Sequence, residues 1–326
     1  MPQGDSAARW RFVADRAKRS PWTLRLADHL GRGVGRFRLP GLRGLPPAAT
    51  PDLANWGGHE AAAVWLGHAS MLFRIAGLTV LADPVFSERI GLQIGPLTAG
   101  PRRRQGAALD VEGLPRVDVV VVSHAHFDHL DRPTLWRLAR RFPAATVVTS
   151  ANCADLLTDL GFAAVRELGW GETTTREGLT VTALETKHWG PRVFYDNHRS
   201  YGAFLLSAAG RRILYGSDSA YFRGWEHLAG SGGVDLACVG IGAYDPYIAA
   251  HATPEQAAEM ARGAGARAVL PMHHSTFKLS HELMDEPLAR FRVAAADLTV
   301  AATEIGAVWV APRLDAVAPT GQTPPQ

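Results

Sequence analysis

The sequence predicts a layered α/β protein, built as one domain or as two fused halves that meet near residues 195–200. Two observations support this fold class. Short apolar runs alternate with helical stretches from about residue 60 to residue 311, and several of the runs are nearly continuous in Val, Ile and Leu. Such runs are typical of a sheet that is covered on both faces. The composition, with 47% hydrophobic and 20% charged residues among 326, is that of a globular chain able to bury one large core or two modest ones.

The expected elements follow one another closely along the chain. The strands are residues 61–66, 70–75, 78–82, 117–122, 145–149, 179–185, 202–207, 211–216, 234–240, 267–271, 298–302 and 307–310. The helices are residues 132–141, 152–160, 254–264 and 282–296. The third helix has a clear start, because Thr253 can cap it, Pro254 takes the first helical position and Gln256 stands three residues after the cap.

The two ends of the chain differ in composition from its middle. Residues 1–58 are a basic N-terminal arm that ends in a Gly- and Pro-rich strap over 31–58, and residues 1–50 hold ten Lys/Arg against three Asp/Glu. Residues 59–311 are the expected main domain, and residues 312–326 an expected disordered tail. The net charge of the whole chain is only +3, so the basic character of the arm is local.

The arm has two interpretations. It interleaves Trp10, Phe12 and Trp22 with arginines, so it could pack on the main domain through its aromatic rings or make a peripheral contact with an anionic membrane. A nucleic acid is not an expected partner. No apolar run has the roughly 18–20 residues of a membrane-spanning helix, and charges occupy the position of a signal peptide's apolar core. We therefore expect a cytoplasmic protein. With only two cysteines, we also expect Cys153 and Cys238 to be buried free thiols.

The strongest signal for chemistry directly follows the expected strand 117–122. There the sequence SHAHFDHLD contains the pattern His-x-His-x-Asp-His. As the strand ends in a turn, His124 and His126 can converge on one point, while Asp128 and His129 can be directed to a second point a few ångströms away. Imidazole and carboxylate ligands suit Zn²⁺ and, to a lesser degree, Mn²⁺ or Fe²⁺. The loop therefore predicts half of a two-metal site. Three further candidate ligands each follow a later expected strand: His188, Asp218 and His273.

This order of ligands resembles the metallo-β-lactamase superfamily. The segments WLGHASMLFRIAGLTVLADPVFS, TKHWGPR, GSDSAYF, GIGAYDPYIAAHATPEQA and MHHSTFKL are similar to the branch of N-acylphosphatidylethanolamine-hydrolysing phospholipase D and its bacterial relatives. The lactonase of bacterial ascorbate catabolism is a more distant relative. The resemblance covers about residues 55–290. It implies a four-layer αβ/βα sandwich with a dinuclear metal site at one edge, between two sheets.

The resemblance also implies the ligands of two Zn²⁺ ions. Three residues would hold each ion and one would bridge them: His124, His126 and His188 for the first, Asp128, His129 and His273 for the second, and Asp218 as the bridge. His274 departs from the branch, in which an aromatic residue is expected at this position. Of the adjacent pair we prefer His273 as the ligand, since it aligns with the family ligand and neighbouring side chains point to opposite faces.

Further residues are candidates for the surroundings of the metals: His68, Asp83, Trp189, Tyr221, Tyr244, His251, His274 and Phe277. Asp83 could orient a ligand histidine by accepting its distal N–H, or it could hold an Asp-Pro turn through local backbone N–H groups. His68 and His251 either transfer protons or contact substrate, or they are structural histidines. The aromatic residues either line the pocket or belong to the core.

The resemblance implies a hydrolase whose nucleophile is a hydroxide that bridges the two metals. Asp128 and Asp218 could accept a proton from the attacking water, and His251 is the candidate group near the leaving oxygen. Position 126 is His rather than the Glu expected in the diiron oxygen-reducing relatives, which favours hydrolysis. Three functions compete: a phospholipase D-like phosphodiesterase acting on a small or lipid-like substrate, a lactone or carboxylic-ester hydrolase, and a non-catalytic metal-binding or interaction protein. We favour the first, and no feature of the sequence indicates the oligomeric state.

Overall fold

The computed structural model describes residues 45–313, apart from residues 55, 96 and 194. Nearly all of them belong to one compact unit, while residues 93–98 belong to a second unit. The first 44 residues of the predicted arm and the tail from residue 314 lie outside the described residues. Of the predicted strap, residues 45–54 form no helix or strand, and η1 (Trp56–Gly58) is one short 3₁₀ helix.

Seven strands form the first sheet, in the order β15-β1-β2-β3-β6-β7-β8. They are β1 (Ala61–Gly67), β2 (Ser70–Ile75), β3 (Leu78–Ala82), β6 (Val119–Val122), β7 (Thr146–Ser150), β8 (Ala164–Leu168) and β15 (Val308–Val310). Strands β1, β2 and β3 form an antiparallel meander, and β3, β6, β7 and β8 run parallel. The last strand, β15, pairs antiparallel with β1.

Six strands form the second sheet, in the order β14-β13-β12-β11-β10-β9. They are β9 (Thr173–Arg176), β10 (Leu179–Leu184), β11 (Ala203–Ala208), β12 (Arg211–Tyr215), β13 (Leu236–Gly240) and β14 (Val269–Met272). The strands from β9 to β12 are antiparallel, and β12, β13 and β14 are parallel. Separately, β4 (Leu92–Ile94) and β5 (Leu97–Ala99) pair as a two-stranded sheet of their own.

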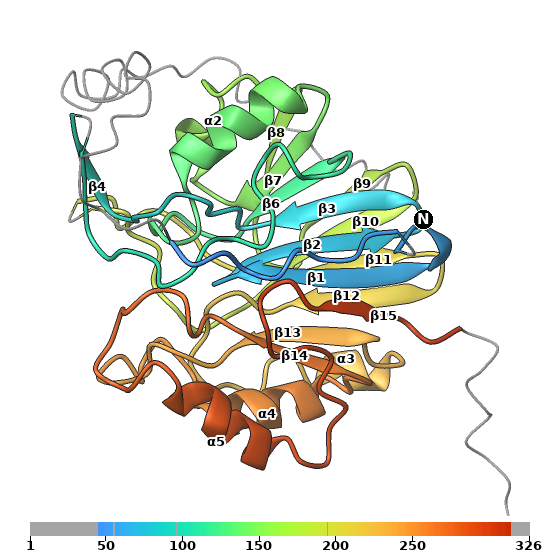
Figure 1. The fold of residues 1–326 in the computed structure, drawn as a ribbon. Helices are drawn as coiled ribbons and strands as arrows, with labels where there is room; N and C mark the ends of the chain where they lie inside the picture. Colours follow the sequence, from blue (N-terminus) through green and yellow to red (C-terminus); the bar gives the residue numbers. More distant parts are fainter. Residues whose placement is uncertain (1–44, 55, 96, 194, 314–326) are drawn as a thin grey trace, which may run out of the picture. The chain divides into compact units, whose positions relative to one another are not determined.

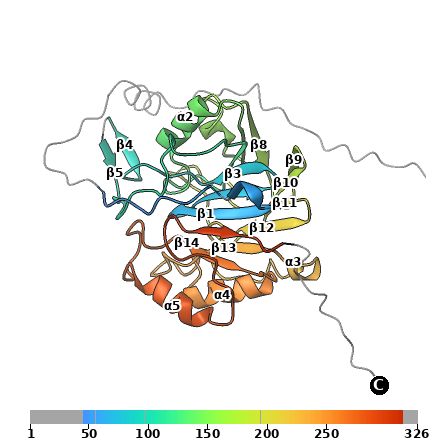
Figure 2. The same cartoon turned by 45° about the vertical axis from the view of Figure 1, so that its right-hand side comes forward.

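The helices cover the outer faces of the two large sheets (Figures 1 and 2). They are α2 (Arg132–Arg141), α3 (His227–Gly230), α4 (Pro254–Gly263) and α5 (Glu286–Ala294), with the 3₁₀ helix η2 (Ala154–Leu156). Figure 1 shows α2 on the side of the first sheet and α4 with α5 on the side of the second. The main unit is therefore helix, sheet, sheet, helix, which confirms the predicted four-layer sandwich. No helix among the described residues is long and apolar enough to cross a membrane.

The apolar runs are buried on both faces, as their continuous pattern predicts. Along β11, Phe204 and Leu206 belong to the core cluster that includes both sheets and α2, while Ala203 and Leu205 belong to the cluster beneath α4 and α5. Alternate side chains of one strand thus fill two different cores. The capping box predicted at Thr253 is present at the start of α4, and both cysteines are buried and free.

Several predicted boundaries are wrong. The two sheets change over between β8 and β9, at residues 168–173, and not near residues 195–200. The predicted helix 152–160 contains only η2, and the helix 282–296 is shortened to α5. The predicted strand 298–302 makes one isolated bridge, between Val300 and Val269. Strands β4, β5, β8 and β9 and helix α3 were not predicted. The sequence of β9 is polar, and β8 is half-buried.

Strand direction brings six loops to the same edge of the sheets. In the first sheet, β1, β3 and β6 run in one direction. In the second sheet, β10, β12 and β14 also share a direction, because two antiparallel pairings separate β10 from β12 and parallel pairings join β12 to β14. The segments that follow these six strands carry the residues of chemical interest.

A side chain at Gly242 would collide with the backbone that follows β14. An added Cβ atom would lie 2.3 Å from the carbonyl oxygen of His273. We expect Gly242→Ala to lower the free energy of unfolding by about 1–3 kcal/mol, the usual cost of overpacking, as measured by urea denaturation of the metal-free protein. The matched control is Gly230→Ala, where nothing lies within 4 Å of the added carbon. An equal loss of stability in both variants would contradict this prediction.

Candidate metal centre

Three histidines form the first group of facing side chains. His124 and His126 follow β6, and His188 follows β10. Nε2 of His124 lies 2.9 Å from Nδ1 of His126, which in turn lies 3.3 Å from Nε2 of His188. These three nitrogen atoms point at one position, as expected for ligands of one cation.

The second group contains Asp128, His129 and His273, and His68 lies beside them. Oδ2 of Asp128 is 3.3 Å from Nε2 of His273 and 3.7 Å from Nε2 of His129. Nε2 of His68 is 3.0 Å from the same oxygen and can donate a hydrogen bond to it. The structure therefore places His68 against a predicted ligand.

Asp218 lies between the two groups. Its Oδ2 atom is 3.1 Å from Nε2 of His129 and 3.3 Å from Nε2 of His273. The same oxygen is 3.7 Å from Nε2 of His188 and 3.9 Å from Nε2 of His124. One carboxylate thus faces ligands of both groups, which is the position that a bridging ligand requires.

The donor atoms of this cluster fit two divalent cations. Nε2 of His129, Nε2 of His273 and Oδ1 of Asp218 are buried and have no hydrogen-bond partner among the described residues. Buried polar atoms without a partner are costly and rare. A bound cation would satisfy all three, because imidazole nitrogen and carboxylate oxygen are the ligands that Zn²⁺ takes in the absence of thiolates.

The electrostatics of the cluster also favour cation binding. Burial would raise the pKa of Asp218, but the charges of His129 and His273 outweigh burial and hold this pKa well below its usual range. The pKa of Asp128 is likewise lowered against the effect of burial, chiefly by His129. Burial lowers the pKa of His124 well below its usual value, so this imidazole is neutral and ready to ligate. Burial would also lower the pKa of His129, but Asp218 and Asp128 raise it well above its usual value. A divalent cation would replace the proton that these carboxylates attract.

Asp83 contacts one predicted ligand and the start of the loop that carries predicted ligands. Its carboxylate is completely buried and lies 2.6 Å from Nδ1 of His129. The backbone N–H of Ser123 donates to Oδ1 over 2.7 Å, and the hydroxyl of Tyr215 donates to Oδ2 over 2.6 Å. Of the two interpretations of Asp83, the structure therefore favours the orientation of a ligand histidine over the support of a local turn.

His251 lies beside the first group. Its Nδ1 atom is 3.9 Å from Oδ2 of Asp218, and the carbonyl oxygen of the preceding residue, Ala250, accepts a hydrogen bond of 2.9 Å from Nδ1 of His188. Burial lowers the pKa of His251 to about 3. Its neutral ring can donate an N–H hydrogen bond to a group bound at the centre.

Two of the four candidate aromatic residues contact ligand-side rings. The indole of Trp189 stacks on the imidazole of His188, with 4.9 Å between ring centroids. Phe277 meets His68 edge-on at 5.1 Å. His274 turns away from the carboxylates and packs against Trp65, with 4.6 Å between ring centroids.

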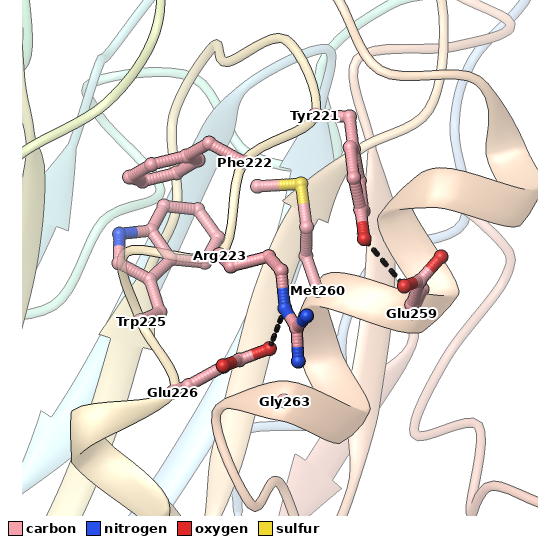
Figure 3. Close-up of a pocket in the computed structure, with 8 residues that line it drawn as sticks. All are labelled: Tyr221, Phe222, Arg223, Trp225, Glu226, Glu259, Met260 and Gly263. Carbon is pink, nitrogen blue, oxygen red and sulfur yellow. Dashed lines mark hydrogen bonds and ion pairs between the residues drawn. The ribbon is translucent and has the colours of Figure 1, made fainter.

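The other two aromatic candidates face helices. The hydroxyl of Tyr244 donates to Glu286 of α5 over 2.8 Å. The hydroxyl of Tyr221 donates to Glu259 of α4, in a surface pocket shown in Figure 3. None of the residues that line this pocket is a predicted metal ligand: Tyr221, Phe222, Arg223, Trp225, Glu226, Glu259, Met260 and Gly263. Among the described residues, the recorded contacts of Tyr221 and Tyr244 are therefore with helices, and none of them is with the ligand cluster.

Strained backbone surrounds the cluster. Six residues at this edge have positive φ although they are not glycine: His68, Asp83, Ser217, Ala243, His273 and Ser275, with φ between 38° and 66°. Such conformations cost about 1–3 kcal/mol each and persist only where surrounding contacts hold them. Their clustering is typical of a functional site.

The sequence did not indicate three residues that contact the predicted ligands, their loop or Asp83. They are Ser123, Tyr215 and Arg192. The hydroxyl of Ser123 lies 2.9 Å from Nδ1 of His124, and Nη1 of Arg192 donates to backbone carbonyl groups of the same loop. The only signal in the sequence is their closeness to ligands, which does not by itself indicate a contact.

Comparison with known proteins agrees with this geometry. Residues 79–274 match the family described as the Beta-lactamase superfamily domain. The chain is 30% identical over 271 residues to N-acyl-phosphatidylethanolamine-hydrolyzing phospholipase D 1 of Caenorhabditis elegans, covering 76% of this chain and 75% of the worm protein. It is 28% identical over 224 residues to a UPF0173 metal-dependent hydrolase of Rubrobacter xylanophilus, covering 65% of this chain and 81% of that protein.

A solved structure shares the fold. The metallo hydrolase Igni18 from Ignicoccus hospitalis aligns with a TM-score of 0.59 and 19% identity, over 76% of this chain and 97% of that one. The chain therefore belongs to the metallo-β-lactamase superfamily, as a metal-dependent hydrolase of that group. The resemblance seen in the sequence is confirmed.

Removal of the carboxylate that orients His129 should weaken metal binding. We expect the wild-type protein to bind two Zn²⁺ per chain, and Asp83→Asn to lower the affinity of one of them by about 10–100-fold, the usual effect of changing a partner of a ligand histidine. Elemental analysis and competition with a chromophoric chelator measure both quantities. Asp110→Asn is the control, because Asp110 is exposed and its carboxylate accepts a hydrogen bond from the backbone N–H of Gly113. An unchanged affinity in Asp83→Asn would refute this role.

Proposed function

We propose that the protein is a dinuclear, zinc-dependent phosphodiesterase that acts on an amphiphilic phosphodiester. The observation that carries the proposal is the position of Asp218, whose Oδ2 atom lies within 3.9 Å of imidazole nitrogens from both ligand groups. The choice of a phosphodiester is supported by the similarity to the phospholipase D of Caenorhabditis elegans. Mn²⁺ and Fe²⁺ are the alternative metals for this ligand set.

The residues around the metals have separate tasks in this proposal. Two bound divalent cations would polarise the phosphoryl group and lower the pKa of a water that they share. The ionised carboxylates of Asp128 and Asp218 balance the cation charge, and Asp218 can accept the proton of the attacking water. The hydroxyl oxygen then forms a bond to phosphorus as the bond from phosphorus to the leaving oxygen breaks.

The leaving oxygen must gain a proton when the phosphodiester is cleaved. His251 is our candidate for this role, with its Nδ1 atom 3.9 Å from Oδ2 of Asp218. A neutral His251 can donate a hydrogen bond to the leaving oxygen, and the proton taken up by Asp218 can be passed on across this short distance. The products are then an alcohol and a phosphomonoester.

An exposed apolar wall beside the cluster supports an amphiphilic substrate. Trp189 is 41% exposed although it stacks on His188, and its ring centroid is 6.1 Å from that of Tyr247. Tyr247 and the adjacent Ile248 are 45% and 48% exposed. Trp189 and Tyr247, which are large, exposed side chains next to a predicted ligand, form a surface that an acyl or aryl group can cover.

The proposed reaction predicts which substrates are hydrolysed. Zn²⁺-loaded protein should hydrolyse bis(p-nitrophenyl) phosphate faster than a panel of lactones and p-nitrophenyl carboxylic esters, as measured by product release. Asp218→Ala should lower turnover at least a hundredfold, about 3 kcal/mol, because this carboxylate faces both ligand groups. Faster turnover of the lactones or esters would favour the alternative carbonyl hydrolase. Activity of Asp218→Ala within tenfold of wild type would contradict the bridging role.

The apolar wall predicts a dependence on chain length. With methyl, butyl and octyl p-nitrophenyl phosphodiesters, kcat/KM of the wild type should rise at least tenfold from methyl to octyl, since each buried methylene contributes up to about 0.8 kcal/mol. Trp189→Ala should remove most of this rise and leave the methyl substrate less affected. Trp136→Ala is the matched control, because Trp136 is 37% exposed and lies on α2. Equal slopes in the wild type and Trp189→Ala would exclude the wall as a binding surface.

A further inference from the structure

Arg192 contacts the loop that carries four of the predicted ligands, which we define as the ligand loop, residues 123–130. Nη1 of Arg192 donates hydrogen bonds to the carbonyl oxygens of Ala125, over 2.7 Å, and of Leu130, over 2.9 Å. Its Cζ atom lies 3.9 Å from the centroid of the Phe127 ring, a cation–π contact. All three contacts fall on the ligand loop.

These contacts add to hydrogen bonds within the ligand loop, in which the N–H groups of His129 and Leu130 donate to the carbonyl oxygen of His126. The first residue of the loop is anchored by Asp83, which accepts hydrogen bonds from it. Residues 126–128, in the middle of the loop, are only partly buried. Arg192 spans this middle section, from the carbonyl group of Ala125 to that of Leu130. A single nitrogen atom therefore joins the carbonyl groups at the two ends of the section.

Arg192 is a charged group whose close contacts are carbonyl groups and an aromatic ring. Among the described residues no carboxylate lies within ion-pair distance of it, and burial together with the charge of Arg132 lowers its pKa to about 9, although the charges of Asp131 and Asp196 act in the opposite direction. Burying a cation is costly unless it is well hydrogen-bonded. The two carbonyl groups and the face of Phe127 offset this cost only in the observed geometry. These contacts therefore hold the guanidinium group against the ligand loop.

Arg192 also connects the two segments that supply the first ligand group. It stands four residues after His188 in the chain, whereas His124 and His126 belong to the ligand loop. A shift of the segment around His188 would therefore pull on the carbonyl groups of that loop. Metal ligands must be held to within about 0.5 Å of their productive positions, which makes such a connection consequential.

We propose that Arg192 is a positioning residue that fixes the geometry of the ligand loop relative to His188 and so sets the affinity of the metal centre. In this proposal it acts through the ligand loop and is not itself a ligand. The role requires a planar group that bonds to two acceptors and stacks on a ring at the same time. A lysine at this position keeps the charge but offers one compact ammonium group, so it can reproduce only part of these contacts.

The test is the affinity of the full-length protein for Zn²⁺, measured by competition with a chromophoric chelator. We expect Arg192→Met to weaken Zn²⁺ binding by about 10–100-fold, as for other groups that orient metal ligands. Arg192→Lys should bind Zn²⁺ with an intermediate affinity. The absorption spectrum of the Co²⁺-loaded protein should change in both variants, because it reports ligand geometry independently of catalysis.

Arg199→Met is the matched control. Arg199 is a buried arginine of the same segment, but it pairs with Asp155 and Asp196 and donates to the carbonyl group of Asn152. Its loss should lower the unfolding free energy of the metal-free protein while leaving Zn²⁺ affinity within threefold of wild type. The proposal is overturned if Arg192→Met or Arg192→Lys keeps wild-type affinity and Co²⁺ spectrum. It is also overturned if Arg199→Met weakens Zn²⁺ binding as much as Arg192→Met does. If Arg192→Met does not fold, Arg192→Lys decides the question.

Discussion

The buried carboxylate of Asp83 is the interaction on which the rest of the site depends. It joins β3 and β6 of the first sheet to β12 of the second, because Ser123, His129 and Tyr215 all donate hydrogen bonds to it. A completely buried carboxylate is tolerated only when its oxygen atoms are satisfied in this way. The same bonds that satisfy Asp83 also fix the tautomer of His129, so that its Nε2 atom faces the cluster. Fold and site are thus stabilised by one set of contacts.

The ligand cluster itself opposes folding in the absence of cations. It gathers several buried imidazoles and two carboxylates, leaves buried donor and acceptor atoms without partners, and is surrounded by left-handed backbone at residues such as His68 and His273. Each of these features costs free energy. Cation binding would offset part of this unfavourable free energy, since binding free energy at such a site is also folding free energy. The two well-packed hydrophobic clusters on either side of the second sheet supply the remaining stability.

Much of this architecture could be predicted from local pattern, and the failures have physical reasons. Continuous apolar runs predicted most strands of the two sheets, and the ligand spacing after them predicted the cluster. Strand β9 was missed because its Thr-rich sequence lies at a sheet edge with alternate residues exposed. The helix expected at 152–160 is interrupted because Asn152 adopts positive φ and the N–H of Ala154 donates to Glu167, a partner on β8. The contacts of Arg192 were missed for the same reason, since they depend on segments that only the tertiary fold brings together.

The pairing of β15 with β1 has a consequence for how the protein is made. The first strand of the sandwich finds its outer neighbour only in Val308–Val310, the last strand of the described chain. During synthesis, the ribosome has produced nearly all of the sandwich before this neighbour emerges. Until then the edge of β1 presents unpaired N–H and C=O groups on an apolar strand, which is the kind of edge that pairs with strands of other chains. The pairing of β15 therefore covers the edge of β1 only late in synthesis.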